Sequence, residues 1–96
     1  MNPSYNSALH RLKYYTKCMK YDEMVHAVSL KNQALYGDDY EKNQHEKNPD
    51  ILEKWKSLKG MGRDEALNKF AKYTNEMVNK YDCFNNDIYD KMNDKN

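Results

Sequence analysis

The chain has 96 residues, of which 39% are hydrophobic and 32% are charged, and its 16 basic and 15 acidic residues give a formal net charge of +1 at pH 7. A chain of this length builds one hydrophobic core, so we expect a single domain. A near-neutral protein lacks the strong positive field that attracts nucleic acid, and we expect no nucleic-acid partner. Residues 1–21 form a basic segment without acidic residues, and its cations are Arg11, Lys13, Lys17 and Lys20.

The sequence shows no targeting signal or membrane anchor. A secretory signal needs an apolar run that the first residues lack, and a membrane span needs about 18 apolar residues in succession. Two cysteines, Cys18 and Cys83, are too few for a disulfide framework and have no metal-ligand spacing. We therefore expect a cytoplasmic monomer that does not insert stably into membranes, in which a disulfide is the minority outcome.

The first predicted helix begins at Pro3 and Ser4, where the missing N–H of proline leaves no helical hydrogen bond unmade. Apolar residues then recur three and four positions apart, so they share one face of the helix. We expect this face to enter the core. It consists of Tyr5, Ala8, Leu9, Leu12 and Tyr15.

The second predicted helix extends from a cap at Asp22 to Gly37, because glycine readily adopts the conformation that ends a helix. Apolar residues occupy two of its sides, which predicts a helix packed between two neighbours. Lys31 and Asn32 interrupt one of these sides. The interruption fits a cleft that binds a ligand, and it fits equally well two exposed residues late in a helix.

A polar stretch from Asp38 to Pro49 follows, and loops of this length in small domains are commonly functional or mobile. The third predicted helix begins at an Asp50 cap and ends at Gly60, with the single tryptophan Trp55 as its core anchor. The fourth predicted helix ends near Tyr81. We therefore expect an all-α helical domain over residues 1–82 and a polar C-terminal tail over residues 83–96.

The sequence contains no recognisable catalytic motif. Three histidines, His10, His26 and His45, share no metal-ligand spacing. A glycine-rich phosphate loop and a nucleophile elbow are also missing. We therefore expect neither an enzyme nor a cofactor or metal ion.

Lysines at the borders of the apolar faces suggest that the chain binds an anion. A lysine stem covers apolar surface while its ammonium group reaches a phosphate. The alternative is that the same lysines are solvated residues on helix faces, and periodicity alone favours this alternative. The lysines are Lys13, Lys31, Lys47 and Lys54.

Short motifs follow one another along the chain in a characteristic order. They are Asp22-Glu23-Met24, Gln33-Ala34 with Gly37-Asp38, Trp55-x-x-Leu58-Lys59-Gly60, and Glu65-Ala66 with an aromatic ring at Phe70. In their order and spacing, over about residues 5–81, they resemble the acyl-CoA-binding protein (ACBP) family, of which this chain looks like a divergent member. The resemblance implies a four-helix bundle with up-down-down-up topology that carries long-chain acyl-CoA esters without chemistry.

The resemblance also implies where the ligand contacts lie, and several of these positions hold residues that differ from the family. Lys13 matches a family lysine in the first helix. This chain replaces residues that the family has in three helices. They are two tyrosines and a lysine in the second helix, a Lys-Trp pair in the third and a tyrosine in the fourth. The replacing residues are Val28, Lys31, Asn32, Ile51, Leu52 and Phe70.

We therefore expect a non-catalytic, lipid-binding protein for fatty-acyl-CoA transport, whose ligand is a small molecule, the acyl-CoA ester. Lysine ammonium groups would hold the phosphates, Val28 and Phe70 would line the adenine and pantetheine region, and apolar residues would shelter the acyl chain. The replaced residues favour an alternative, a helical protein-interaction module that kept the fold but weakened or lost acyl-CoA binding. The expected contacts are Leu9, Lys13, Val25, Val28, Lys31, Asn32, Lys47, Ile51, Leu52, Lys54 and Phe70.

Overall fold

The computed structural model describes the backbone over residues 3–39 and 46–93, and the side chains over residues 5–39 and 46–81. Within these ranges the chain forms four helices and no strand, which confirms the all-α prediction. Half of the polar stretch from Asp38 to Pro49, including His45, lies outside the described residues. The helices are α1 (Pro3–Tyr15), α2 (Tyr21–Tyr36), α3 (Pro49–Ser57) and α4 (Arg63–Asn93).

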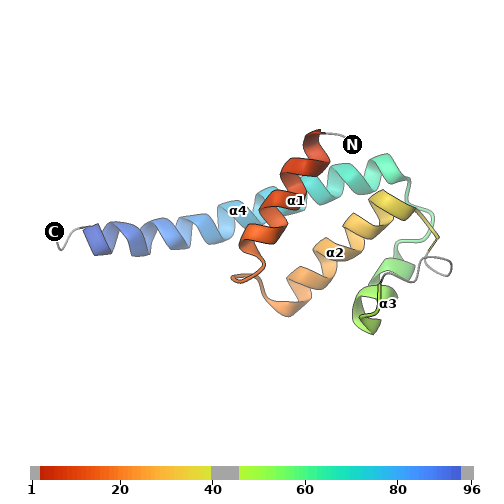
Figure 1. The fold of residues 1–96 in the computed structure, drawn as a ribbon, viewed down its shortest axis with the longest axis horizontal. Coiled ribbons are helices and arrows are strands. Elements are labelled where there is room, and N and C mark those ends of the chain that lie inside the picture. Colours follow the sequence, from red (N-terminus) through yellow and green to blue (C-terminus); the bar gives the residue numbers. More distant parts are fainter. Residues whose placement is uncertain (1–2, 40–45, 94–96) are drawn as a thin grey trace.

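The longest helix, α4, is the element against which two of the other helices pack. Both α1 and α2 pack against α4, and α3 packs against α2. Figure 1 shows α1 crossing α4, α3 at the opposite side of α2, and α4 continuing past the other three helices. The prediction that α2 is packed between two neighbours is therefore confirmed.

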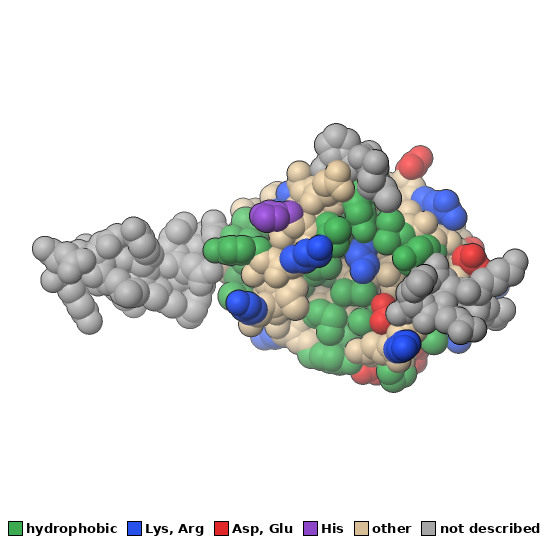
Figure 2. Space-filling view, in the orientation of Figure 1, with side chains coloured by type: hydrophobic (Ala, Val, Ile, Leu, Met, Phe, Trp, Pro, Cys, Tyr) green, Lys and Arg blue, Asp and Glu red, His purple; other side chains and the backbone are tan. Residues whose placement is uncertain are grey.

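The core lies where α1 and α2 meet α4. The predicted face of α1 is confirmed, because Tyr5, Ala8, Leu12 and Tyr15 are all buried. The ring of Tyr5 lies 6.0 Å from that of Phe70 on α4, which is fully buried. Burial of each large apolar side chain stabilises the fold by about 1.5–3 kcal/mol. Part of the apolar surface stays visible over α1 and α2 (Figure 2).

Trp55 anchors α3 in the core, as predicted, and its side chain is fully buried. Its indole N–H donates to the side-chain oxygen of Gln33 at 3.0 Å and to the carbonyl of Gly37 at 2.9 Å. The Gln33 amide in turn donates to the carbonyl of Met61 at 2.7 Å and to the Asp38 carboxylate at 2.8 Å. This network ties the end of α2 to α3 and to the connection between α3 and α4.

The beginning of α2 differs from the prediction. The helix begins at Tyr21 behind Lys20, and Asp22 lies inside its first turn. The backbone N–H of Lys20 donates to the Glu23 carboxylate at 2.8 Å. This is one half of a capping box, and it satisfies a donor at the helix start although the lysine side chain offers no acceptor.

The cap of α3 also differs from the prediction, because Asn48 and not Asp50 occupies that position. The Asn48 side-chain oxygen accepts the backbone N–H of Asp50 at 2.9 Å and that of Ile51 at 3.4 Å. Pro49 then takes the first helical position, where its fixed φ and its missing N–H fit the helix. The prediction placed the cap two residues too late.

The helix ends show one confirmed prediction and one difference. Gly37 and Gly60 adopt positive φ angles of 62° and 91°, as expected for the glycines that follow α2 and α3. The helix α4 continues to Asn93, beyond the end predicted near Tyr81. The physical reason is composition, because residues 63–93 contain neither glycine nor proline to end the helix.

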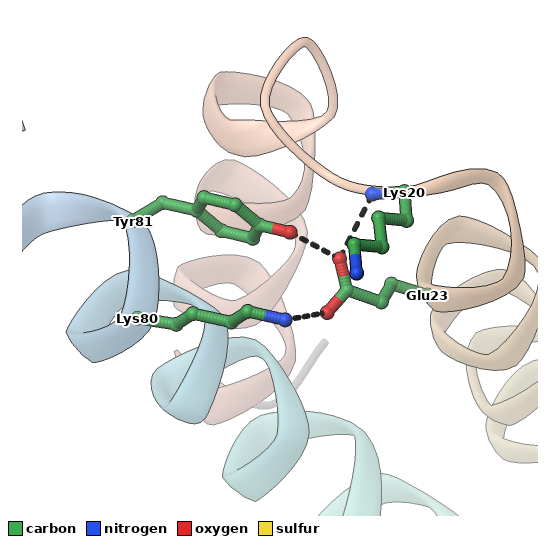
Figure 3. A network of polar contacts seen from close by, with 4 residues as sticks. All are labelled: Lys20, Glu23, Lys80 and Tyr81. Atoms are coloured by element: carbon green, nitrogen blue, oxygen red, sulfur yellow. Dashed lines mark hydrogen bonds and ion pairs between the residues drawn. The ribbon is translucent and has the colours of Figure 1, made fainter. Parts of the chain in front are cut away.

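A buried carboxylate that the sequence analysis did not identify joins the start of α2 to α4 (Figure 3). Glu23 is only 8% exposed, and its carboxylate pairs with Lys80 and accepts hydrogen bonds from the Tyr81 hydroxyl and the Lys20 backbone. Burial by itself would raise the pKa of Glu23, but these partners outweigh burial and lower its pKa to about 2. The ionised carboxylate is therefore the stable form in the folded chain.

Candidate functional site

A groove formed by α2, α3 and α4 contains two adjoining pockets, of about 470 Å³ and about 290 Å³. His26 and Tyr73 line both pockets and separate them. The larger, called the α3 pocket, is also lined by Tyr21, Asp22, Val25, Asp50 and Lys54. The smaller, called the α4 pocket, is also lined by Leu30, Leu58, Met61, Lys69, Lys72 and Glu76.

Two residues that line the α3 pocket, Tyr21 and Asp50, connect the first turns of α2 and α3. The Tyr21 hydroxyl donates to the Asp50 carboxylate at 2.7 Å, and this hydrogen bond raises the pKa of Tyr21. Val25 supplies apolar surface from α2, and Lys54 supplies an ammonium group from α3. The pocket therefore offers apolar surface and a cation on different helices.

The boundary between the pockets is an aromatic pair. The rings of His26 and Tyr73 meet edge to face, with their centroids 4.6 Å apart. Burial lowers the pKa of His26, and the positive charges of Lys54 and Lys69 lower it further, while Glu76 acts in the opposite direction. His26 is therefore neutral at pH 7. Burial also raises the pKa of Tyr73, so its hydroxyl stays protonated.

Two of the expected ligand contacts, Val25 and Lys54, come together in the α3 pocket. Leu9 and Val28 pack against the core cluster and are partly exposed. Val28 lines neither pocket, although it follows Val25 by three residues and so lies only about 60° from it around α2. Of the expected residues of α2, Val25 is therefore the one that lines either of these pockets.

Three expected contacts have almost no exposed surface. Phe70 is 0% exposed, Asn32 is 4% exposed and Ile51 is 5% exposed. The Asn32 amide donates to the Glu46 carboxylate at 2.8 Å, and the Ile51 carbonyl accepts the Ser29 hydroxyl at 3.2 Å. These residues build the fold, and a ligand touches them only if the chain rearranges.

The remaining expected contacts lie at the surface and line neither pocket. Figure 2 shows hydrophobic and basic side chains together on the face over α1 and α2, which is the combination that the sequence analysis expects around a ligand. Lys13 and Lys47 are exposed, whereas Lys31 and Leu52 are partly exposed.

Several groove residues were not predicted. Lys69, Lys72, Tyr73 and Glu76 recur at intervals of three and four along α4, which the sequence alone presents as an ordinary solvated face. His26 was considered only as a metal ligand. A possible signal was the aromatic residue Tyr73 within this polar face.

Two further features concern the kind of protein. In the ranges with described side chains, no three His, Cys, Asp or Glu residues lie close enough together to hold a metal ion. None of the described helices has the combination of length and apolarity needed to cross a bilayer.

Comparison with known proteins gives no match: no protein-family model fits the sequence, and no curated protein or solved structure is significantly similar to it.

Proposed function

We propose that the chain binds long-chain fatty acyl-CoA esters and carries them in the cytoplasm without chemistry. The observation that supports this function best is that Val25 and Lys54 line one pocket. In the proposal Val25 on α2 shelters the acyl chain and Lys54 on α3 helps to hold the phosphates. An apolar side chain near an ammonium group suits an amphipathic anion.

The energetics of such a ligand fit the pocket. Each methylene removed from water contributes about 0.8 kcal/mol, and a charge-assisted hydrogen bond to a phosphate contributes about 1.5–3 kcal/mol. The α3 pocket, at about 470 Å³, falls within the size range of ligand pockets. Lys54 is exposed, so its flexible stem is free to follow a phosphate.

In this proposal the bundle is of the ACBP type, with up-down-down-up topology. Lys13 on α1 and Lys31 on α2 hold the phosphates, together with Lys54 or Lys47. Apolar residues of α1 and α2 accompany the chain, and the protein acts as a monomer. The buried Phe70 and Asn32 do not take part in binding.

Calorimetric titration with coenzyme A, octanoyl-CoA, dodecanoyl-CoA and hexadecanoyl-CoA tests the proposal. Affinity should increase with chain length until the apolar surface is filled, because each added methylene leaves water. Coenzyme A alone should bind more weakly than every ester. A weak response that does not change along the series would contradict the carrier function.

The alternative, a helical protein-interaction module without a ligand, is favoured by the enclosure of Phe70, Asn32 and Ile51. Native mass spectrometry of the purified chain separates the two functions. A retained acyl-CoA supports the carrier. A ligand-free chain that also fails to bind hexadecanoyl-CoA supports the interaction module.

A further inference from the structure

The α4 pocket contains none of the ligand contacts expected from the sequence, yet it has the composition of a small binding site. Its apolar part consists of Leu30, which is 2% exposed, and of Leu58 and Met61, which are partly exposed. Leu58 and Met61 pack against the core cluster, so they are held in place. These three residues form an apolar surface, called the apolar floor, against which a short apolar chain can pack.

The charged part of the pocket comes from one side of α4. Lys69 and Lys72 are three residues apart, so their side chains lie on adjacent turns of the same face. Lys69 pairs with Glu65 at 3.2 Å, but both side chains are more than half exposed, and such a pair is weak. Lys72 makes no ion pair with any residue that the structure describes. With Glu76 as the acidic group of this lining, the pocket favours a single negative charge.

We propose that the α4 pocket is a separate binding site for a medium-chain carboxylate, with its charge between Lys69 and Lys72 and its chain over the apolar floor. A volume of about 290 Å³ lies at the lower end of the range for ligand pockets, which suits a short chain. The α4 pocket shares His26 and Tyr73 with the α3 pocket, but Lys13 and Lys31 do not line it, so an anion there does not need the lysines proposed to hold the acyl-CoA phosphates.

His26 should make binding at this site depend on pH. A bound anion offsets the positive charges of Lys54 and Lys69 that oppose protonation of His26. The pKa of His26 therefore rises on binding. By linkage, the anion binds more tightly as the pH falls through the range in which His26 takes up its proton. The other charged or titratable groups lining the two pockets around His26 are Tyr21 and Asp22 on α2, Asp50 on α3, and Lys72, Tyr73 and Glu76 on α4.

Octane-1-sulfonate is the main probe, because its charge does not titrate and any pH dependence must come from the protein. Two-dimensional NMR of the full chain should show saturable binding, with the largest shifts at His26 and Tyr73. Affinity should rise as the pH falls from 7.5 through 5.5 and below, by at most about tenfold for each unit by which binding raises the pKa of His26. Octanoate should compete with the probe, and octan-1-ol should bind much more weakly.

The matched variants are Lys72→Gln and Lys17→Gln, which remove one exposed lysine charge inside and outside the pocket. Lys72→Gln should weaken octane-1-sulfonate binding about two- to fivefold, and Lys17→Gln should leave it unchanged. Equal effects of the two variants, equal binding of octan-1-ol, or unsaturable shifts would overturn the proposal. A separate site also requires that Lys13→Ala leaves octane-1-sulfonate binding intact, whatever it does to acyl-CoA binding.

Discussion

The ammonium nitrogen of Lys80 lies 2.5 Å from a carboxylate oxygen of Glu23, although the two residues are 57 positions apart in the sequence. The pair joins the first turn of α2 to α4 (Figure 3). The Glu23 side chain is 10% exposed and the Lys80 side chain is 48% exposed. Water solvates the lysine, whereas the buried carboxylate depends on its partners in the protein to stay ionised.

The variant Glu23→Gln should destabilise the fold by about 1–3 kcal/mol, because the amide loses the charge that holds Lys80. Chemical denaturation with urea measures the change. Glu53→Gln is the matched control, since it makes the same substitution at an exposed position of α3 and should change stability by less than about 0.5 kcal/mol. Equal effects of the two variants would contradict the role of the Glu23 contact.

The contribution of Glu23 should depend on pH. Its pKa is about 2 in the folded chain against an ordinary value of 4.5, so the unfolded chain binds more protons between these values. The stabilisation is therefore complete above about pH 5 and is lost as the pH falls toward 2. Thermal melting of the wild type and Glu23→Gln should show a difference that shrinks over this range. A difference that stays constant would contradict the assignment.

The variant Trp55→Phe should destabilise the fold by about 2–4 kcal/mol. The phenyl ring cannot donate to Gln33 and Gly37, and it leaves part of the buried indole volume empty. Thermal or urea unfolding followed by circular dichroism measures the effect. Tyr14→Phe serves as the control, because Tyr14 is 66% exposed and the exchange keeps its ring.

The variant Gly37→Ala should cost about 1–2 kcal/mol, because its φ of 62° strains any residue with a Cβ. The added Cβ would also lie 3.3 Å from the guanidinium Nε of Arg63. Gly62→Ala should have a smaller effect, since a Cβ there meets nothing within 4 Å. Similar losses in the two variants would show that the positive φ is not the cause.

The variant Lys13→Ala should weaken binding of hexadecanoyl-CoA by about 1–3 kcal/mol and leave the fold intact, because Lys13 is exposed. Calorimetry gives the affinity, and circular dichroism monitors the fold. Lys17→Ala removes an exposed lysine just after α1 and should not change the affinity. An unchanged affinity in Lys13→Ala would exclude Lys13 from the binding site.

Much of the fold follows from local patterns in the sequence. The face of α1 and the burial of Trp55 were predictable, because apolar side chains at helical spacing have few other ways to leave water. The ends of α2 and α3 were also predictable from the glycines that follow them, since a positive φ favours glycine. The cap at Asn48 was missed because Asp50 is an equally good cap in isolation, and Pro49 decides between them.

The contacts between distant segments were not predictable. Glu23 looks like an ordinary acidic residue of a first turn, and only the packing of α2 on α4 brings Lys80 and Tyr81 to it. For the same reason, His26 and Tyr73 gave no sign that they meet in a groove. Sequence patterns show which face of a helix is apolar, but they do not show which polar residues of two helices come together.

The most direct test of the proposed function is two-dimensional NMR of the full chain during titration with hexadecanoyl-CoA. The proposal predicts saturable shifts of the Val25 methyl groups and of the Lys54 side chain, and much smaller shifts at the same positions with coenzyme A alone. Saturation with hexadecanoyl-CoA that leaves Val25 and Lys54 unshifted, or a titration without any saturable change, would contradict it.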